Sequence, residues 1–366
     1  MKAKQNMKKR LAILFGGRST EHEVSLISAA GILENIHKDR YEILPIKITR
    51  EGKWLLLDAK GGAGGKRLEG DAGIPVLPGE PGCGLIRLDH LKAVPVDVVF
   101  PVLHGTFGED GTLQGMLSMA GIPFVGGGVL ASALGMDKIV MKQIFIQNDL
   151  QTVDFIWFLR NRWKRESEAI ARGIRQEIGY PCFVKPANTG SSVGINKAHD
   201  ETELRKFVEE ACSYDRKVIV EKAVDARELE CSVLGNDDPK GSVVGEIIPS
   251  REFYDYEAKY RDENSRAVIP ADIPEDTANR IRYMAVAAFQ AVDCAGYARV
   301  DFLLDRKTGR LYLNEINTIP GFTPISMFPK LWEATGLCYP DLIDRLIELA
   351  LERHGDIQQS RFLKGK

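Results

Sequence analysis

Two predicted strands near the C-terminus carry acidic side chains. They are RVDFLL (299–304) and LYLNEIN (311–317), and the intervening DRKTGR has the length and composition of a hairpin turn. The apolar residues beside the acids, among them Val300, Phe302 and Ile316, indicate that both strands are buried on one face. The sequence therefore predicts an antiparallel hairpin that sets its acids next to a hydrophobic core.

This hairpin would gather one arginine, two acids and one amide. With the turn centred on Thr308, Asp301 lies opposite Glu315. Arg299 then lies opposite Asn317, and all four side chains share one face because side chains alternate along a strand. Directly opposed Cβ atoms are about 5 Å apart, so two carboxylates there repel each other. A hard divalent cation such as Mg2+ would relieve that repulsion; the alternative is a solvated hairpin without a ligand.

Composition narrows the class of protein. The 366 residues predict two or three domains, and the formal net charge of −2 gives no reason to expect nucleic acid or a membrane surface as a partner. No apolar run approaches the roughly 18 residues of a membrane span, and the apolar stretch after the basic N-terminus is too short for a signal peptide. The six cysteines form no CxxC pair, which predicts reduced thiols in a cytoplasmic protein.

Strands and helices alternate along most of the chain. Between residues 10 and 120 this alternation predicts a parallel sheet that is covered on both faces. The Gly/Pro-rich stretch 51–92 is expected to be an exposed loop with little regular structure. Breaks in the pattern predict three domains, which are residues 1–132, 133–220 and 221–366.

A loop of small residues follows a predicted strand at Lys185. The segment VKPANTGSSVG (184–194) would let backbone N–H groups approach phosphate oxygens, and the lysine adds a positive charge. The chain contains neither a Walker A sequence nor a GxGxxG fingerprint. Alone the loop could be an ordinary turn, but together with the acids downstream it favours a phosphate site.

Two further segments could serve a nucleotide. Glu221 ends a predicted strand and Glu228 follows seven residues later, where they could bind an adenine edge and a ribose or form surface ion pairs. The segment FYDYEAKYR (253–261) mixes aromatic and charged residues. This mixture suits a loop that closes over a ligand and brings Lys259 to an anion, with a plain surface loop as the alternative.

Glu21 and His104 follow two of the N-terminal strands. Thr20 and Glu23 have the spacing of a helix capping box, so Glu23 can be structural, whereas Glu21 has no such role. At the carboxyl end of a parallel strand, where α/β sheets bind ligands, Glu21 could hold an ammonium group. His104 lies in a Gly-rich loop and could bind a ligand or form a structural hydrogen bond.

Seven segments together resemble the D-alanine–D-alanine ligase family of the ATP-grasp superfamily, and they occur in family order over nearly the whole chain. They are residues 16–25, 103–115, 136–138, the Lys185 loop, 253–260, 299–301 and 314–323. The resemblance implies an α/β fold with three-domain ATP-grasp architecture. An N-terminal parallel-sheet domain would lie over two α+β domains that clamp ATP, and residues 250–270 would form a closing loop.

The resemblance also implies the reaction. The carboxylate of a first D-alanine would attack the γ-phosphate of ATP, and the amine of a second would displace phosphate from D-alanyl phosphate. The product, D-alanyl-D-alanine, would serve peptidoglycan precursor synthesis. Such chemistry depends on positioning and charge neutralisation and needs no protein nucleophile. The family further implies two Mg2+ ions, with Mn2+ as a substitute, and a cytoplasmic homodimer.

On the nucleotide side, the resemblance assigns a role to each candidate residue. Phosphate charge would be neutralised by Lys138, Lys185 and Lys259, and Ser192 would belong to the same nucleotide-binding set. The nucleoside would be faced by Glu221, Lys222 and Glu228. The metal ions would be bound by Asp301, Glu315 and Asn317.

On the amino acid side, the resemblance assigns a second set of residues. Glu21 would hold the ammonium group of the first D-alanine, with His104 close by. Ser326 and Lys259 would bind the carboxylate of the second. The oxyanion would be stabilised by Arg299 and the Gly321 N–H group. A hydrogen-bonded set linking the loop to the active site would consist of Glu21, Ser191 and Tyr260.

Two other functions share parts of this pattern. A D-alanine–D-lactate ligase would keep the fold, but family members with that activity depart from the tyrosine pattern at Tyr260, which favours the dipeptide. A nucleotide-binding regulator without catalysis would be expected to have lost metal or oxyanion positions. Arg299, Asp301, Glu315 and Asn317 are all present and argue against it.

The Glu315→Ala variant is expected to retain the fold but to lose turnover and Mg2+ dependence, because the cation loses a carboxylate ligand. Circular dichroism would check the fold, and phosphate release over a Mg2+ series would check the metal role. Near-normal steady-state rates would contradict that role.

Overall fold

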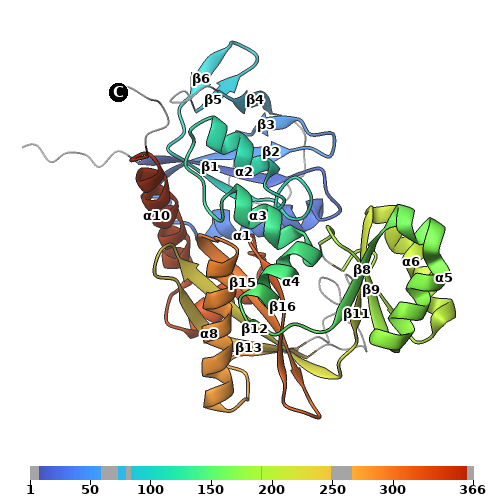
Figure 1. Ribbon diagram of the computed structural model, residues 1–366. Coiled ribbons are helices and arrows are strands. Elements are labelled where there is room, and N and C mark those ends of the chain that lie inside the picture. Colours follow the sequence, from blue (N-terminus) through green and yellow to red (C-terminus); the bar gives the residue numbers. More distant parts are fainter. Residues whose placement is uncertain (1–7, 59–72, 80–83, 191, 249–265, 361–366) are drawn as a thin grey trace, which may run out of the picture.

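The structure is a computed structural model that describes residues 8–58, 73–79, 84–190, 192–248 and 266–360. Three β-sheets follow one another along the chain, and helices pack on each of them (Figure 1). Within these described ranges, no helix combines the length and the apolar character needed to cross a membrane.

The first sheet is parallel where it is most deeply buried. β1 (Lys9–Gly16) pairs in parallel with β2 (Tyr41–Ile48) and with β7 (Val98–Val102). Alternate residues of β1 enter different cores: Leu11 packs with α1 (His22–Asn35), whereas its neighbour Ala12 packs with the opposite cluster. An unbroken apolar run suits a strand that is covered on both faces. The predicted parallel arrangement is confirmed for these three strands.

Residues 51–92 extend this sheet, and the prediction of an irregular exposed loop was wrong for the parts that the structure describes. They form the strands β3 (Trp54–Leu56), β4 (Ile74–Pro78), β5 (Leu85–Arg87) and β6 (Lys92–Val94), added antiparallel beyond β2. Leu55, Val76 and Leu85 are buried, so these strands contribute to the core. Strands of three to five residues among glycines and prolines are too short to show a periodic pattern.

The second sheet is antiparallel and carries the Lys185 loop. Its order is β10–β9–β11–β8, with bounds β8 (Phe155–Leu159), β9 (Cys182–Pro186), β10 (Asn196–Ala198) and β11 (Lys217–Lys222). Two helices, α5 (Arg160–Glu177) and α6 (Glu201–Tyr214), cover one face and bury Val184 and Val220 (Figure 1). The loop joins the end of β9 to β10, at the edge of the sheet.

The third sheet is also antiparallel and carries the predicted hairpin. Its order is β14–β13–β12–β15–β16, with bounds β12 (Ala226–Gly235), β13 (Lys240–Ile248), β14 (Arg266–Val268), β15 (Gly296–Asp305) and β16 (Leu311–Asn317). α8 (Glu275–Ala291) packs on one face against Ala298 and Val300. Because side chains alternate, Arg299 and Asp301 point to the opposite face.

Three helices lead from the first sheet to the others. They are α2 (Thr112–Met119), α3 (Val129–Met136) and α4 (Lys138–Gln147). Met141 and Phe145 of α4 pack into the core of the third sheet. α3 occupies the segment where a domain break was expected, and the proposed boundaries after residues 132 and 220 stay predictions.

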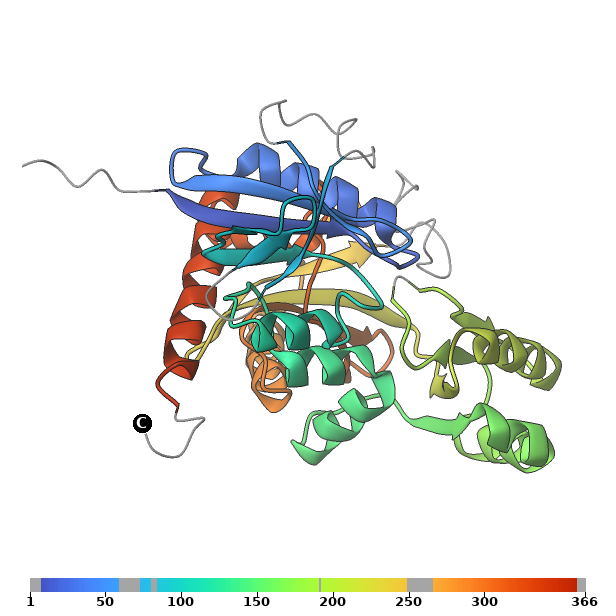
Figure 2. The ribbon, with the colours of Figure 1, turned by 90° about the horizontal axis from the view of Figure 1, so that it is seen from above.

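The last two helices return the chain to the first sheet. α9 (Met327–Ala334) packs on β12 and β13, and α10 (Tyr339–Ile357) lies along the first sheet (Figures 1 and 2). Leu342 and Leu346 share one core with Phe100 of β7. α10 is therefore packed against the first sheet, and through its contacts with β15 it positions the third sheet against the first.

The Leu346→Ala variant is expected to lower the free energy of unfolding by about 2–5 kcal/mol, because it leaves a cavity between α10 and the first sheet. Leu351→Ala on the same helix is the matched control, since Leu351 is only partly buried against this core and should cost less. Urea denaturation of both variants checks that Leu346→Ala loses more unfolding free energy than Leu351→Ala. Equal losses would show that α10 is not anchored through Leu346.

Candidate active site

The predicted hairpin forms, and the register at its acidic end is the predicted one. Asp301 pairs with Glu315, and Arg299 pairs with Asn317. Nearer the turn, the register shifts by one residue, so that Asn314 is an extra residue in β16. Two residues opposite one is the definition of a β-bulge.

The bulge decides which face Glu315 occupies. Without the extra residue, Asp301 would lie opposite Asn314, and Glu315 would point to the other face, because a one-residue slip inverts every side chain. The pairs nearest the turn are centred between Lys307 and Thr308. The predicted turn centre at Thr308 therefore gives the correct pairs only at the acidic end of the hairpin, on the side of the bulge away from the turn.

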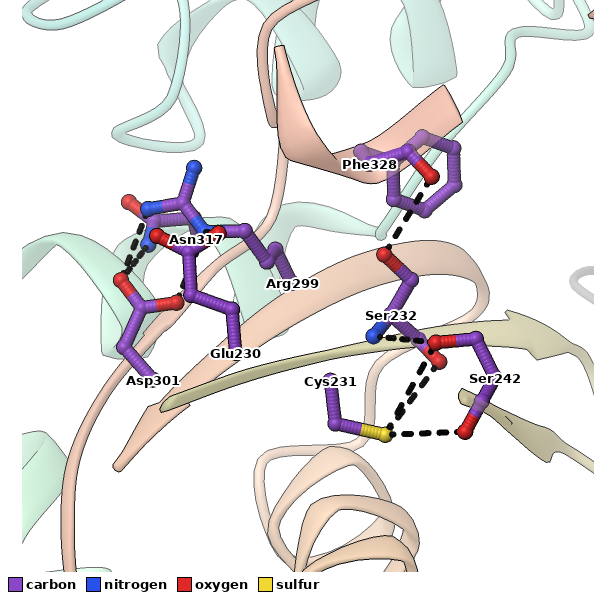
Figure 3. A network of polar contacts seen from close by, with 8 residues as sticks. All are labelled: Glu230, Cys231, Ser232, Ser242, Arg299, Asp301, Asn317 and Phe328. Atoms are coloured by element: carbon purple, nitrogen blue, oxygen red, sulfur yellow. Dashed lines mark hydrogen bonds and ion pairs between the residues drawn. The ribbon is translucent and has the colours of Figure 1, made fainter. Parts of the chain in front are cut away.

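Three carboxylates lie in a row across neighbouring strands. Glu230 of β12 pairs with Asp301, which in turn pairs with Glu315. Arg299 donates to both oxygens of Asp301, from Nε and from Nη2, each at 2.7 Å, and its Nε lies 3.1 Å from Glu230 Oε2 (Figure 3). Asn317 Nδ2 donates to Asp301 Oδ2 at 3.1 Å. The structure thus brings the four predicted residues together and adds Glu230.

The charges in this row fit a cation. Burial would lower the pKa of Arg299, but Asp301 and then Glu230 outweigh it, with help from Glu315, and raise that pKa well above its usual value. Three carboxylates and one guanidinium leave the row itself with surplus negative charge. Carboxylate and amide oxygens on one face are the donors that Mg2+ prefers, so the donor set suits that ion.

Lys185 reaches the same region through Glu221. The Glu221 carboxylate is 2% exposed, with Lys185 Nζ 2.6 Å from Oε2 and Lys142 Nζ 3.2 Å from Oε1. Burial would raise the pKa of Glu221, but the two lysines outweigh it and lower that pKa to about 2. Burial would lower the pKa of Lys185, yet Glu221 and then Glu315 raise it, and Glu228 acts in the same direction. Lys185 therefore stays charged beside the carboxylates.

Lys138 holds the loop that follows Lys185. Its Nζ donates to the Thr189 carbonyl at 2.6 Å, and its backbone N–H donates to the Ala187 carbonyl at 3.1 Å. Ser192 has a left-handed backbone conformation, with φ of 59°, which a tight turn of this loop requires. Lys222 differs from these residues, because its side chain is 53% exposed and lies 3.9 Å from Asp154.

Glu21 lies where the first and second sheets meet. It is 5% exposed, and its carboxylate lies against two glycines from different loops, Gly105 after β7 and Gly190 after β9. A Cβ atom on Gly105 would come within 2.6 Å of Glu21 Oε2, and a Cβ atom on Gly190 would overlap the same oxygen. With a larger residue at position 190, the Glu21 carboxylate or the Lys185 loop would therefore have to shift.

His104 connects the first sheet to the loop of Gly321. Its Nδ1 lies 3.2 Å from the Ile319 carbonyl and must donate to it, so Nε2 accepts from Ser28 Oγ at 3.2 Å. The Phe322 N–H group donates to Ser28 Oγ at 3.3 Å. Burial lowers the pKa of His104 against the opposing effect of Glu21, which favours the neutral ring in which Nε2 accepts.

Gly321 and Ser326 lie together beyond that loop. A Cβ atom on Gly321 would come within 2.8 Å of Ser326 Oγ. Ser326 Oγ accepts from the Thr323 N–H group at 3.0 Å and lies 2.8 Å from Thr323 Oγ1. Gly321, predicted to bind the oxyanion, and Ser326, predicted to bind a carboxylate, are thus neighbours.

Three predicted residues, Ser191, Lys259 and Tyr260, lie outside the described residues, as does most of the predicted closing loop. Their roles stay predictions.

Several charged or polar residues of the site were not predicted. Lys142, Glu230 and Ser28 are buried among the predicted residues. Glu109 accepts from the Gly105 N–H group at 2.6 Å, and burial together with the Glu21 carboxylate raises its pKa to about 8. A signal existed for Glu230 only, as an acid inside the apolar strand sequence LECSVL.

Fold and site together define an ATP-grasp enzyme: a first domain built on parallel strands, and two further sheets that present lysines and a row of acids to each other. The family model for the D-ala D-ala ligase N-terminus matches residues 10–127, and that for the C-terminus matches residues 144–348. The chain belongs to the D-alanine–D-alanine ligase family.

Relatives match over nearly the whole chain. The D-alanine--D-alanine ligase of Acetivibrio thermocellus is 50% identical over 95% of this chain and 97% of its own. The D-alanine--D-alanine ligase of Bacillus cytotoxicus is 48% identical over 96% of this chain and 98% of its own.

Solved structures are similar to this chain over nearly its whole length. The D-alanine-D-alanine ligase from Coxiella burnetii superposes with a TM-score of 0.84 at 36% identity and covers 96% of both chains. VanG D-Ala:D-Ser ligase from Enterococcus faecalis has a TM-score of 0.83 at 38% identity and covers 94% of this chain and 99% of its own. Because the two enzymes are named for different second substrates, the acceptor specificity of this chain needs its own test.

The Gly190→Ala variant is expected to lower turnover by about tenfold or more, because the added methyl group displaces the Glu21 carboxylate or the Lys185 loop by an ångström-scale shift. Gly173→Ala in α5 is the matched control: its Cβ atom would meet nothing within 4 Å, so activity should not change. Initial rates and melting temperatures of both variants check this. Full activity in Gly190→Ala would show that turnover does not depend on this contact.

Proposed function

We propose that this protein ligates two D-alanines to D-alanyl-D-alanine at the expense of ATP, for peptidoglycan precursor synthesis. One observation carries the proposal. Lys185 is on the second sheet, the acidic row is on the third, and Glu21 follows the first strand of the first sheet, yet Glu21 lies against the Lys185 loop and the Glu315 carboxylate helps to raise the pKa of Lys185. Such a junction can hold phosphates and an amino acid side by side.

The first step needs two anions to meet. The carboxylate of the first D-alanine attacks the γ-phosphate of ATP, which forms D-alanyl phosphate and releases ADP. Lys138 and Lys185 supply positive charge to the phosphates, and Glu21 orients the substrate ammonium group. The rate enhancement comes from holding the reacting atoms in line and from offsetting their negative charge, as in other phosphoryl transfers.

The second step is an acyl transfer. The amine of the second D-alanine attacks the acyl carbon, a tetrahedral oxyanion forms, and phosphate leaves as the peptide bond is completed. Arg299 and the Gly321 N–H group would offset the oxyanion charge. The chain Phe322–Ser28–His104–Ile319 supports this assignment, because it fixes the backbone on both sides of Gly321.

Asp301, Glu315 and Asn317 would hold the metal ions. Two Mg2+ ions, or Mn2+ in their place, would supply charge neutralisation between the ATP phosphates. The surplus of carboxylates in the row supports this proposal. A homodimer is proposed from the family resemblance alone.

Incubation with ATP, Mg2+ and D-alanine is expected to release ADP, phosphate and a dipeptide, with L-alanine inactive as the control. Mass spectrometry of reactions that also contain D-serine or D-lactate identifies the acceptor, and D-alanyl-D-alanine should dominate. No D-alanine-dependent phosphate release would defeat the proposal. A dominant D-lactate product would establish the alternative ligase.

A further inference from the structure

Lys142 is a buried lysine at the centre of the site without a role in the mechanism above. It lies on α4, its side chain is 1% exposed, and burial lowers its pKa against the pull of Glu221. A buried ammonium group is costly unless it is paired and hydrogen-bonded. Its two bonds therefore show what it holds in place.

The first bond reaches the β-bulge. Lys142 Nζ donates to the Asn314 carbonyl at 3.0 Å, across 172 residues of sequence. Asn314 is the extra residue of β16, and a bulged residue is left outside the regular ladder. α4 contacts β16 a second time two residues further along, where the Ile316 N–H group lies 3.5 Å from Sδ of Met141. Lys142 thus provides the donor that the bulge needs.

The second bond reaches the nucleotide side. Lys142 Nζ lies 3.2 Å from Glu221 Oε1, and the other oxygen of Glu221 accepts from Lys185 at 2.6 Å. Lys142 therefore connects three elements: α4, the end of β11 and the bulge of β16. An apolar side chain of similar length, such as methionine, would leave the Asn314 carbonyl without its donor and Glu221 with one lysine.

We propose that Lys142 is a positioning residue that holds the β16 bulge and thereby keeps Glu315 and Asn317 on the metal-binding face. The inference rests on the proposed metal site. The bulge alone decides whether Glu315 faces Asp301, because a one-residue slip would turn Glu315 and Asn317 away. Lys142 acts through β16 and does not itself bind the cation.

The test compares variants in two measurements that do not depend on turnover. Mn2+ binding is titrated by electron paramagnetic resonance at saturating ADP, and ADP binding without metal is measured by calorimetry. Lys142→Met should weaken Mn2+ binding by about tenfold or more, the size typical of residues that support metal ligands. Lys142→Arg, which keeps a charged donor, should restore much of that affinity.

Lys217→Met is the matched control. Lys217 lies on β11 and pairs with Asp137, which caps the same helix α4, so its loss removes a partly buried ion pair next to α4 but no contact with the bulge. Its Mn2+ affinity should stay at the wild-type value.

The outcomes separate this inference from the proposed function. If wild-type protein binds no Mn2+, or if Asp301→Asn binds it equally well, the metal site itself is wrong. If wild-type binds Mn2+ and Lys142→Met matches it, only the role of Lys142 is overturned. Equal losses in Lys142→Met and Lys217→Met would also overturn it, because a general loosening of α4 would then suffice. Should Lys142→Met not fold, Lys142→Gln keeps a hydrogen-bond donor without the charge and is expected to bind Mn2+ more tightly than Lys142→Ala.

Discussion

Every charge buried where the three sheets meet must be paired, and this constraint shapes the site. An unpaired buried charge costs several kcal/mol, more than most single contacts return. Glu221 is therefore held between Lys142 and Lys185, and Arg299 lies between Asp301 and Glu230. These pairs join β9, β11, β12, β15 and α4. The charges that suit phosphate and metal binding are thus also the contacts that connect the elements.

Close approach of the loops at the site depends on small residues. Glu21 lies against Gly105 and Gly190, which follow strands of different sheets, so a side chain at either position would displace the Glu21 carboxylate or the loop. His104 and Ser28 add directional bonds from the first sheet to the loop around Gly321. Glycine gives proximity and the hydrogen bonds give orientation, and a reaction between two anionic groups and an amine requires both.

Predictions from the sequence succeeded where a local pattern was long. The hairpin, the helices flanking the Lys185 loop and the parallel strands of the first sheet could all be predicted, because alternation and helical periodicity report burial directly. The short strands within 51–92 were not predicted, because three to five residues are too few to show a periodic pattern of apolar residues. The roles of Lys142 and Ser28 were not predicted for another reason. The sequence of a helix does not show whether one polar residue faces water or a buried backbone group.

The sequence by itself determined which residues could bind phosphate, a cation and an ammonium group, and it determined the alternation that lets Arg299 share a face with Asp301. Only the tertiary structure decided that Glu315 joins them. That outcome depends on one extra residue, Asn314, whose carbonyl is satisfied by a lysine 172 positions away. Alternation is a property of neighbouring residues, whereas the donor for a bulge comes from whichever helix packs on the edge of the sheet.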